Sequence, residues 1–321
     1  MSSAVITFVP LHTELGLIHA SGVDAEKFLQ GQFSNDLRTL ASGHGQWSSY
    51  STAKGRMIAN FYVQRDGNDF WLSLADDMAD TVIERLRKFR MMAKLEIKRG
   101  EPEFTLLAVY GNGAGELLGR ALGVALGKSG NSGVVHDDSI ITRLPWADAE
   151  AFLIILPASR LEALSAKLGA AGARADAAED WRRWAIQAGV GMISRATTEK
   201  VIPQELNLEA LGGINFKKGC YPGQEIVARS HYLGKLKNQT YRIAAPASLR
   251  AGEEIFCTSM GEQSIGIVIN AAPDPQDGFA ALAVLRAANA GETLMAGAPN
   301  GTPLSLGNLP YPLPLDVARE G

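Results

Sequence analysis

The chain has 321 residues, of which 46% are hydrophobic and 20% charged, and its formal net charge is −3. This composition is typical of a soluble globular protein of two or three domains, and it gives no general attraction to nucleic acid. Two cysteines are too few for a disulfide framework, a cluster held by four thiolates of this chain or a structural zinc site, so we expect no metal site.

The N-terminal part of the chain predicts hairpins and helices. A strand is expected over residues 15–20 and a helix after Asp24, its expected N-cap, and the apolar face of that helix contains Phe28, Leu29, Phe33, Leu37 and Leu40. Strands over 45–52, 57–65 and 69–74 precede a helix over 77–92, whose apolar face includes Phe89. These elements predict a mixed α+β lobe.

A similar set of elements follows. Strands are expected over 104–110, 140–144 and 152–156 and helices over 158–170 and 177–188, whereas the Ala/Gly-rich stretch 111–133 predicts no element. The repetition predicts two α+β lobes within residues 1–235. Short strands over 240–244, 254–258, 264–270 and 279–285 then predict a small β-barrel or sandwich in a C-terminal domain, residues 236–321.

No segment predicts a membrane helix or an export signal. The apolar runs are shorter than the roughly 18 residues that cross a bilayer, and residues 1–10 lack a basic start. We therefore expect a cytoplasmic protein without a membrane partner.

Cys220 lies in a loop that favours a reactive thiol. Glycines and a proline surround it in Gly219-Cys220-Tyr221-Pro222-Gly223, and a helix is expected to begin at Pro222 or just after. The positive end of that helix, with Lys217 and Lys218 nearby, favours the thiolate. Cys220 is thus either a nucleophilic, redox or ligand-donating thiol or an inert loop cysteine, whereas Cys257 is expected in the core.

The segment around Cys220 resembles the signature of the YgfZ-type folate-binding proteins. That segment is Phe216-Lys217-Lys218-Gly219-Cys220-Tyr221-Pro222-Gly223-Gln224-Glu225. Residues 28–32 with 35–36, 53–57, 202–204 with 207–208, and 309–311 resemble further segments of the same family in the same order. These proteins are relatives of the glycine-cleavage T-protein and are linked to tRNA modification and iron–sulfur cluster maintenance.

The resemblance implies an α+β fold in the form of a three-lobed ring like that of the T-protein. Two mixed α+β lobes form the folate-binding region, residues 1–235, and a C-terminal β-barrel with its tail occupies residues 236–321. The lobes surround a central channel that holds tetrahydrofolate as the cofactor.

The resemblance also implies residues that contact the folate. Trp181 either stacks on the pterin or is a core tryptophan, and Asn35 and Asp36 either receive ring donors or cap a helix. Gln204 and Gln224 are either pocket amides or braces of a loop, and Lys218 completes the implied set.

The aspartate pair of the T-protein is absent. Its positions correspond to Ala59 and Asn60 here, and neither side chain ionises, so general-base chemistry is not expected at this point. The expectation is a tetrahydrofolate-binding accessory protein that supports iron–sulfur enzymes and tRNA modification through Cys220. The alternatives are a folate-dependent aminomethyltransferase or demethylase and a structural adaptor stabilised by folate.

The expected partners are iron–sulfur enzymes or their assembly proteins, and direct contact with nucleic acid is left open. Basic residues either converge on one face or are scattered over the surface. They are Lys54, Arg56, Lys94, Lys98, Arg99, Lys217, Lys218, Arg229, Lys235 and Lys237.

Overall fold

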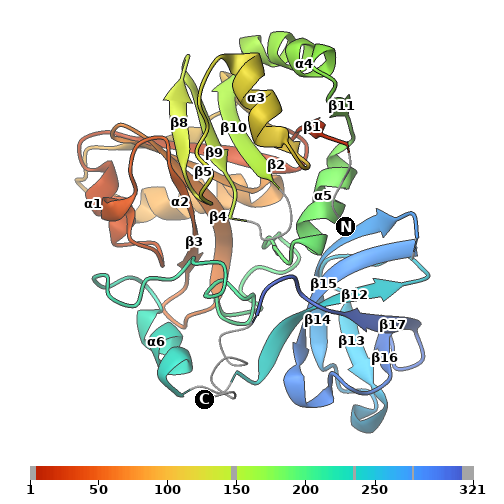
Figure 1. Cartoon of the computed structure of the whole chain (residues 1–321). Coiled ribbons are helices and arrows are strands. Elements are labelled where there is room, and N and C mark those ends of the chain that lie inside the picture. The colour runs from red at the N-terminus through yellow and green to blue at the C-terminus, as the bar shows by residue number, and fades with distance from the viewer. Residues whose placement is uncertain (1–4, 146–149, 234–235, 277, 313–321) are drawn as a thin grey trace. The chain divides into compact units, whose positions relative to one another are not determined.

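The computed structural model describes residues 5–145, 150–233, 236–276 and 278–312, and Figure 1 shows their helices and strands. The chain forms two compact units: unit 1 contains residues 1–48 and 61–181, and unit 2 contains residues 49–60 and 182–321. The division at residue 235 is based on sequence alone and stays a prediction. Among the described residues, no helix is long and apolar enough to span a membrane.

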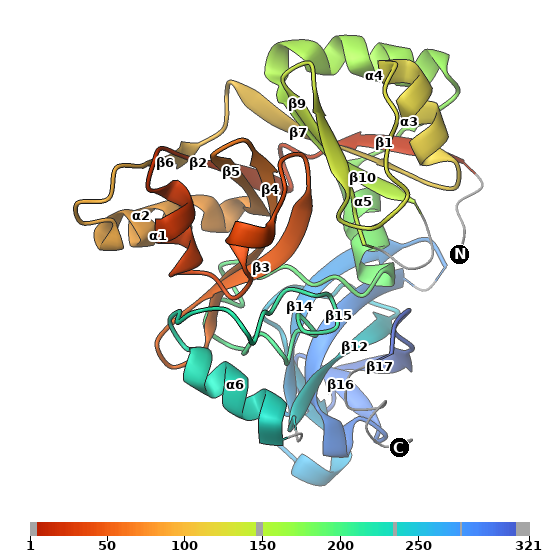
Figure 2. The same cartoon turned by 60° about the vertical axis from the view of Figure 1, so that its left-hand side comes forward.

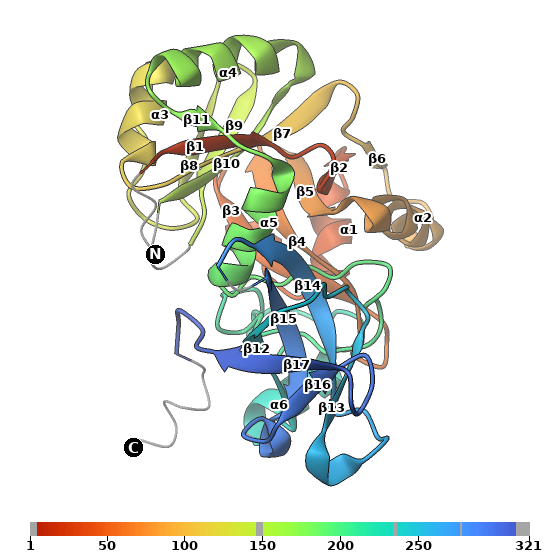
Figure 3. The same ribbon diagram turned by 90° about the vertical axis from the view of Figure 1, so that its right-hand side faces the viewer.

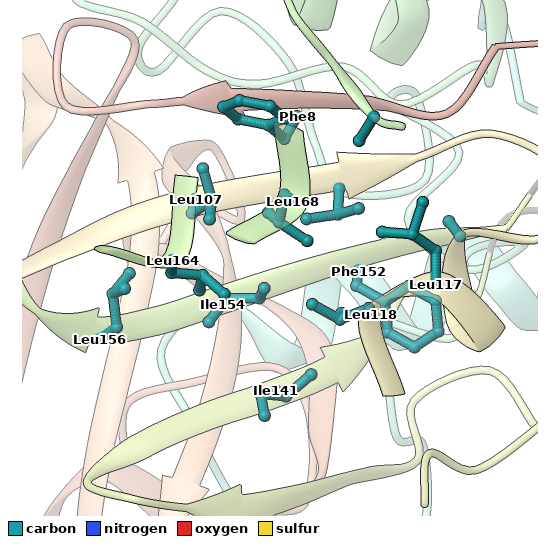
Figure 4. Packing of buried hydrophobic residues seen from close by; sticks show 13 residues of the cluster. Phe8, Leu107, Leu117, Leu118, Ile141, Phe152, Ile154, Leu156, Leu164 and Leu168 are labelled. Atoms are coloured by element: carbon teal, nitrogen blue, oxygen red, sulfur yellow. The ribbon is translucent and has the colours of Figure 1, made fainter. Parts of the chain in front are cut away.

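Unit 1 contains a six-stranded sheet covered on one face by two helices. Its strand order is β11 (Arg174–Ala175), β1 (Thr7–Pro10), β7 (Phe104–Tyr110), β10 (Ala151–Pro157), β9 (Ser139–Arg143) and β8 (Gly133–His136). Figure 4 shows leucines of α3 (Ala114–Leu122) and α4 (Leu161–Ala170) packing on β7, β9 and β10. Burial of these apolar side chains stabilises the layer, since the strand and helix faces are removed from water together.

Helix α3 was not predicted, because its Ala/Gly-rich sequence hides a short apolar face. Leu117 and Leu118 are buried on that face. A Cβ atom on Gly115 would lie 3.1 Å from the Phe152 ring, so the glycine allows α3 to approach β10 closely. The strands and helices expected in this part of the chain over 104–110, 140–144, 152–156, 158–170 and 177–188 are confirmed, the last as α5 (Ala178–Gln187).

A five-stranded sheet contains the N-terminal hairpins. Its order is β3 (Gly45–Ser51), β4 (Met57–Asp66), β5 (Asp69–Ala75), β2 (Leu15–Ser21) and β6 (Glu96–Arg99). Strands β3 and β4 each contribute residues to both units. Helix α2 (Ala79–Phe89) lies along β2 and β6, as Figure 2 shows.

The expectation of one long helix after Asp24 is wrong. Helix α1 (Ala25–Gln30) is short, and a separate 3-10 turn forms over Leu37–Thr39. Asn35 Oδ1 accepts the N–H of Asp36, and Asp36 accepts the N–H of Arg38, so these side chains bind the backbone in a form that competes with a helix.

Two smaller expectations for this region hold only in part. Asp24 is the N-cap residue of α1, as expected, but its carboxylate does not bind the helix backbone, because it accepts the backbone N–H of Lys94 at 2.7 Å. The buried face of α2 ends at Leu86, and Phe89 is 62% exposed.

Unit 2 contains a closed barrel, seen in Figure 3. Its order is β12 (Asn238–Ala245), β15 (Gly278–Arg286), β14 (Gly266–Asp274), β13 (Glu254–Cys257), β16 (Leu294–Ala296) and β17 (Thr302–Gly307). The first four strands in sequence were predicted, whereas β16, which is three residues long, and β17, which contains Pro303 and Gly307, were not. Cys257 is buried in the barrel core, as expected.

Glu101, between β6 and β7, provides a test of pH-dependent stability. One carboxylate oxygen accepts the N–H of Leu17 at 2.8 Å, whereas the other is buried and has no partner among the described residues. Burial raises the pKa of Glu101. Since the folded-state pKa is raised, its stabilising contribution is present below about pH 4, near the unfolded pKa, and is lost as the pH rises.

Glu101→Gln keeps the acceptor for Leu17 and removes the ionisation. We expect the thermal midpoint of the variant, relative to that of the native chain, to rise between pH 4 and pH 8. The measurement is thermal unfolding followed by circular dichroism at both pH values. A difference between the two proteins that is the same at pH 4 and pH 8 contradicts the assignment.

Candidate functional site

Cys220 presents its thiol on the surface of unit 2. The side chain is exposed and precedes helix α6 (Gln224–Leu233), so the expected position before a helix N-terminus is confirmed. No helix or strand forms in the described stretch between Gln187 and Gln224. Long irregular segments of this kind inside compact domains are usually functional, and this one is held by side chains.

Two glycines fix the Cys220 loop against the turn between β3 and β4. Gly223 has φ +80°, and a Cβ atom there would lie 2.6 Å from the carbonyl oxygen of Thr52 and 2.7 Å from Cα of Gly55. Gly55 has φ +73°, and a Cβ atom on it would lie 2.8 Å from Cβ of Ile226. Only glycine permits both the backbone angles and this contact, so the two glycines hold the loop on the turn.

Lys218 does not flank the thiol as a solvated ammonium group. Its side chain is buried, and Nζ lies 5.1 Å from the ring centre of Tyr221, in a cation–π arrangement. Burial raises the pKa of Tyr221 to about 12, so the phenol stays neutral at physiological pH. Lys217 is the exposed cation of the loop. A folate contact by Lys218 stays a prediction.

Helix α6 is held at both ends. Near its start, the amide nitrogen of Gln204 donates to the carbonyl oxygen of Val227 at 2.5 Å. Near its end, His231 stacks on Phe216 with ring centres 3.9 Å apart, and its Nδ1 lies 2.8 Å from a carboxylate oxygen of Glu209. These contacts position the helix that follows Cys220.

Two asparagines, on strands of two different sheets, hold residues 191–193. Asn60 on β4 donates to the carbonyl oxygen of Gly191 and accepts the N–H of Ile193, both at 2.8 Å. Asn270 on β14 accepts the N–H of Met192 at 2.7 Å and donates to its carbonyl oxygen at 3.0 Å. The partners fix both amide orientations, because an amide N–H₂ faces a carbonyl and an amide oxygen faces an N–H. We name this arrangement the asparagine clamp.

Sequence reasoning singled out Asn60 only as a missing aspartate and did not identify Asn270. The signal for Asn270 is the irregular pairing of β14 with β15 between Val268 and Asn270, which a sequence does not reveal.

Except for residues 28–32 and 35–36, which belong to unit 1, the segments that carry the family resemblance lie in unit 2. Arg56, from residues 53–57, donates to the carbonyl oxygen of Lys200 at 2.6 Å and lies 3.6 Å from the carboxylate of Glu205. Tyr311, from residues 309–311, donates to the carbonyl oxygen of Gly189 at 2.7 Å. Gln204, from residues 202–204, binds Val227 of α6. These segments therefore support the irregular loop region of unit 2. Leu313 and Pro314 of the tail lie outside the described residues.

The predicted site residues of unit 1 already have protein partners. The guanidinium of Arg38 binds Asp36 and lowers the pKa of that carboxyl group, and Asp36 caps the 3-10 turn. The amide of Asn35 donates to the carbonyl oxygen of Trp47 at 2.9 Å. Trp181 is buried, and its ring lies 5.7 Å from that of Tyr110. These contacts are structural, and folate binding by these residues stays a prediction.

Two buried polar atoms have the chemistry to receive a pterin. Gln204 Oε1 in unit 2 is a buried acceptor, and Trp47 Nε1 in unit 1 is a buried donor; neither has a partner among the described residues. A pterin ring carries both N–H donors and a carbonyl acceptor, so each atom fits such a ligand by itself. Gln224 is half-buried as the first residue of α6, and Trp47 was not identified from the sequence.

The described residues contain no group of three or more His, Cys, Asp and Glu side chains that would hold a metal ion.

The comparisons identify related proteins. The family model described as the GCVT N-terminal domain matches residues 12–218. The tRNA-modifying protein YgfZ of Photorhabdus laumondii is 33% identical over 77% of this chain and 73% of its own length. The protein of the same name from Shigella sonnei is 34% identical over 75% of this chain and 73% of its length.

A solved structure shares the fold. The glycine cleavage system aminomethyltransferase T from Bartonella henselae matches with a TM-score of 0.72 and 19% identity, over 96% of this chain and 87% of that chain. This match confirms the T-protein-like fold implied by the motifs.

Proposed function

Since this chain belongs to the YgfZ family of tRNA-modifying proteins and carries the GCVT N-terminal domain, we propose that it is a tetrahydrofolate-binding accessory protein. It supports the maturation or repair of iron–sulfur enzymes, including enzymes that modify tRNA, and it acts in the cytoplasm. Its partners are those enzymes or their assembly proteins.

The observation that carries this proposal is the exposed thiol of Cys220 on a loop fixed by Gly223 and Gly55. A fixed, accessible thiol is suited to meet a metal or sulfur atom held by another protein. One thiolate is a fraction of the ligand set of an iron–sulfur cluster, so the partner supplies the remaining ligands. In this role the cluster is cargo that passes between proteins.

The asparagine clamp argues against the alternative of an aminomethyltransferase. Both atoms of the Asn60 amide bind the backbone of residues 191–193, and Asn60 is fully buried. An amide is not a general base, and this one serves to position the chain. The neighbouring Ala59 adds no ionisable group.

The test of the proposal is the rate of Cys220 alkylation by iodoacetamide with and without saturating tetrahydrofolate. Cys220→Ser is the blank, because the remaining thiol, Cys257, is buried. We expect rapid alkylation of Cys220 and a rate that changes with folate. A slow rate that folate leaves unchanged contradicts the role of Cys220 in a folate-linked site.

The cellular arm compares sulfur-containing tRNA nucleosides in cells that carry the native chain or Cys220→Ser. The expected result is a loss of these nucleosides in the variant at equal protein levels. Unchanged tRNA thiolation overturns the accessory role.

A further inference from the structure

The connection from α2 to β6 exposes an unusual amount of apolar surface. Phe89 is 62% exposed, Met91 90% and Met92 94%. These are three of the eight exposed large hydrophobic side chains of the described residues, and they lie within four positions. A cluster of this kind marks an interaction site more often than a random surface. We call residues 84–99 the α2–β6 segment; Figure 2 shows it at the edge of the five-stranded sheet.

The same segment concentrates positive charge. It contains seven basic and two acidic residues, a net charge of +5 in a chain whose total is −3. The exposed cations flank the apolar side chains in sequence and are Arg87, Lys88, Arg90, Lys94 and Lys98. Such a concentration gives the segment a local attraction to polyanions that the net charge of the chain hides.

The structure separates the basic residues singled out in the sequence into two groups. Lys94, Lys98 and Arg99 belong to the α2–β6 segment in unit 1, although Arg99 is paired with Asp76 and Asp80. The other described members of that set belong to unit 2, and Lys235 lies outside the described residues.

The turn that displays these side chains is firmly held. Arg90 donates to the carbonyl oxygen of Leu95 at 2.9 Å, and Arg87 donates to that of Ile97 at 2.9 Å. Asp24 accepts the N–H of Lys94 at 2.7 Å, which joins the turn to the start of α1. These three hydrogen bonds hold the backbone of Lys94, Leu95 and Ile97, directly after the exposed Phe89, Met91 and Met92.

We propose that the α2–β6 segment binds an unpaired segment of RNA. The cations provide contacts for phosphates, the Phe89 ring offers a face on which a base stacks, and the thioethers of Met91 and Met92 make favourable contacts with aromatic rings. Unpaired loop bases are free to contact these groups, whereas the bases of a duplex are stacked on one another. The inference goes beyond the proposed function, because it needs neither Cys220 nor folate.

The order of the side chains favours RNA over a lipid surface. In sequence, Lys88 and Arg90 flank Phe89, and Lys94 follows Met91 and Met92, so cations and apolar groups are interspersed through the tip. A single strand of RNA likewise intersperses charged phosphates with apolar base faces. Insertion into a bilayer instead requires apolar groups in front of the cations.

The experiment measures fluorescence anisotropy of labelled RNA with the full-length chain. The probe is a hairpin with a seven-nucleotide unpaired loop, and the reference is a fully paired duplex of equal length. We expect tighter binding of the hairpin and weakening of that binding as salt increases. The triple variant Phe89→Ser, Met91→Ser and Met92→Ser should weaken hairpin binding by at least about tenfold.

Matched charge reversals isolate the cations. Lys88→Glu with Lys94→Glu should weaken hairpin binding and flatten its salt dependence. Lys128 and Lys167 are also exposed in unit 1, and the double variant Lys128→Glu with Lys167→Glu should bind the hairpin more tightly than the first double variant does. All of these substitutions are at the surface, and an unchanged thermal midpoint verifies the fold.

Three outcomes overturn the proposal. One is equal affinity for hairpin and duplex, and the second is equal affinity of the native chain and the triple variant for the hairpin. The third is the absence of RNA binding. If the native chain then sediments with vesicles of phosphatidylcholine and phosphatidylglycerol and the triple variant does not, the surface is assigned to a membrane.

Discussion

Replacing Asn60 with aspartate is expected to lower the free energy of unfolding by about 3 kcal/mol at pH 8. The side chain is fully buried, and its amide nitrogen donates to the carbonyl oxygen of Gly191. An ionised carboxylate has no proton to donate, so it would face that carbonyl oxygen with like partial charges and without water. The contact to the N–H of Ile193 remains possible and limits the loss.

The pH dependence of this variant separates charge from shape. A protonated carboxyl group both donates and accepts, so it restores the two contacts of the amide. Burial raises the folded-state pKa of such a carboxyl, and its stability is therefore present at low pH and lost as the pH rises. Urea unfolding at pH 5 and pH 8 measures the change.

Asn68→Asp is the control, because Asn68 is exposed in the β4–β5 turn. Equal urea midpoints for Asn60→Asp and the native chain at pH 8 contradict the role of the asparagine clamp. A loss of stability at pH 8 that is recovered at pH 5 shows instead that an ionised carboxylate is not tolerated at this position. The amide of Asn60 thus holds residues 191–193 and does not act as a general base.

Much of the fold is readable from the sequence where local patterns decide it. Short runs of apolar and aromatic residues bounded by turn residues predict β4 and β5, and similar short runs predict the first strands of the barrel. The pattern misleads after Asp24, where apolar spacing predicts one long helix but Asn35 and Asp36 bind the local backbone instead. It also omits α3, in which packing of Leu117 and Leu118 outweighs the low helix propensity of the glycines.

The candidate site is readable only in part, since its support comes from distant residues. The glycines beside Cys220 identify a special loop, but the partner of Gly223 is the turn at Gly55. Asn60 is 131 residues from Gly191 in sequence, and no local pattern indicates that they are bonded. Lys218 illustrates the same limit, because its place in the motif predicts an exposed cation and its packing on Tyr221 buries it.

Gly223→Ala is expected to lower the free energy of unfolding by about 3 kcal/mol and to expose the Cys220 loop. The new methyl group needs a left-handed backbone at φ +80° and meets the backbone of Thr52 and Gly55 at 2.6 and 2.7 Å. Neither neighbour is a flexible side-chain end, so the loop has to move away from the turn. Urea unfolding measures the loss, and tryptic cleavage after Lys218, which is buried in the native chain, should become faster.

Gly212→Ala is the matched control for Gly223→Ala. Gly212 has φ +69° in the same irregular segment, but a Cβ atom there meets nothing within 4 Å. It therefore carries only the conformational cost of about 1 kcal/mol and leaves cleavage after Lys218 slow. The difference between the two variants is the contribution of the close approach of Gly223 to Gly55. Equal losses and equal cleavage rates would mean that the backbone angle alone matters and that another contact positions Cys220.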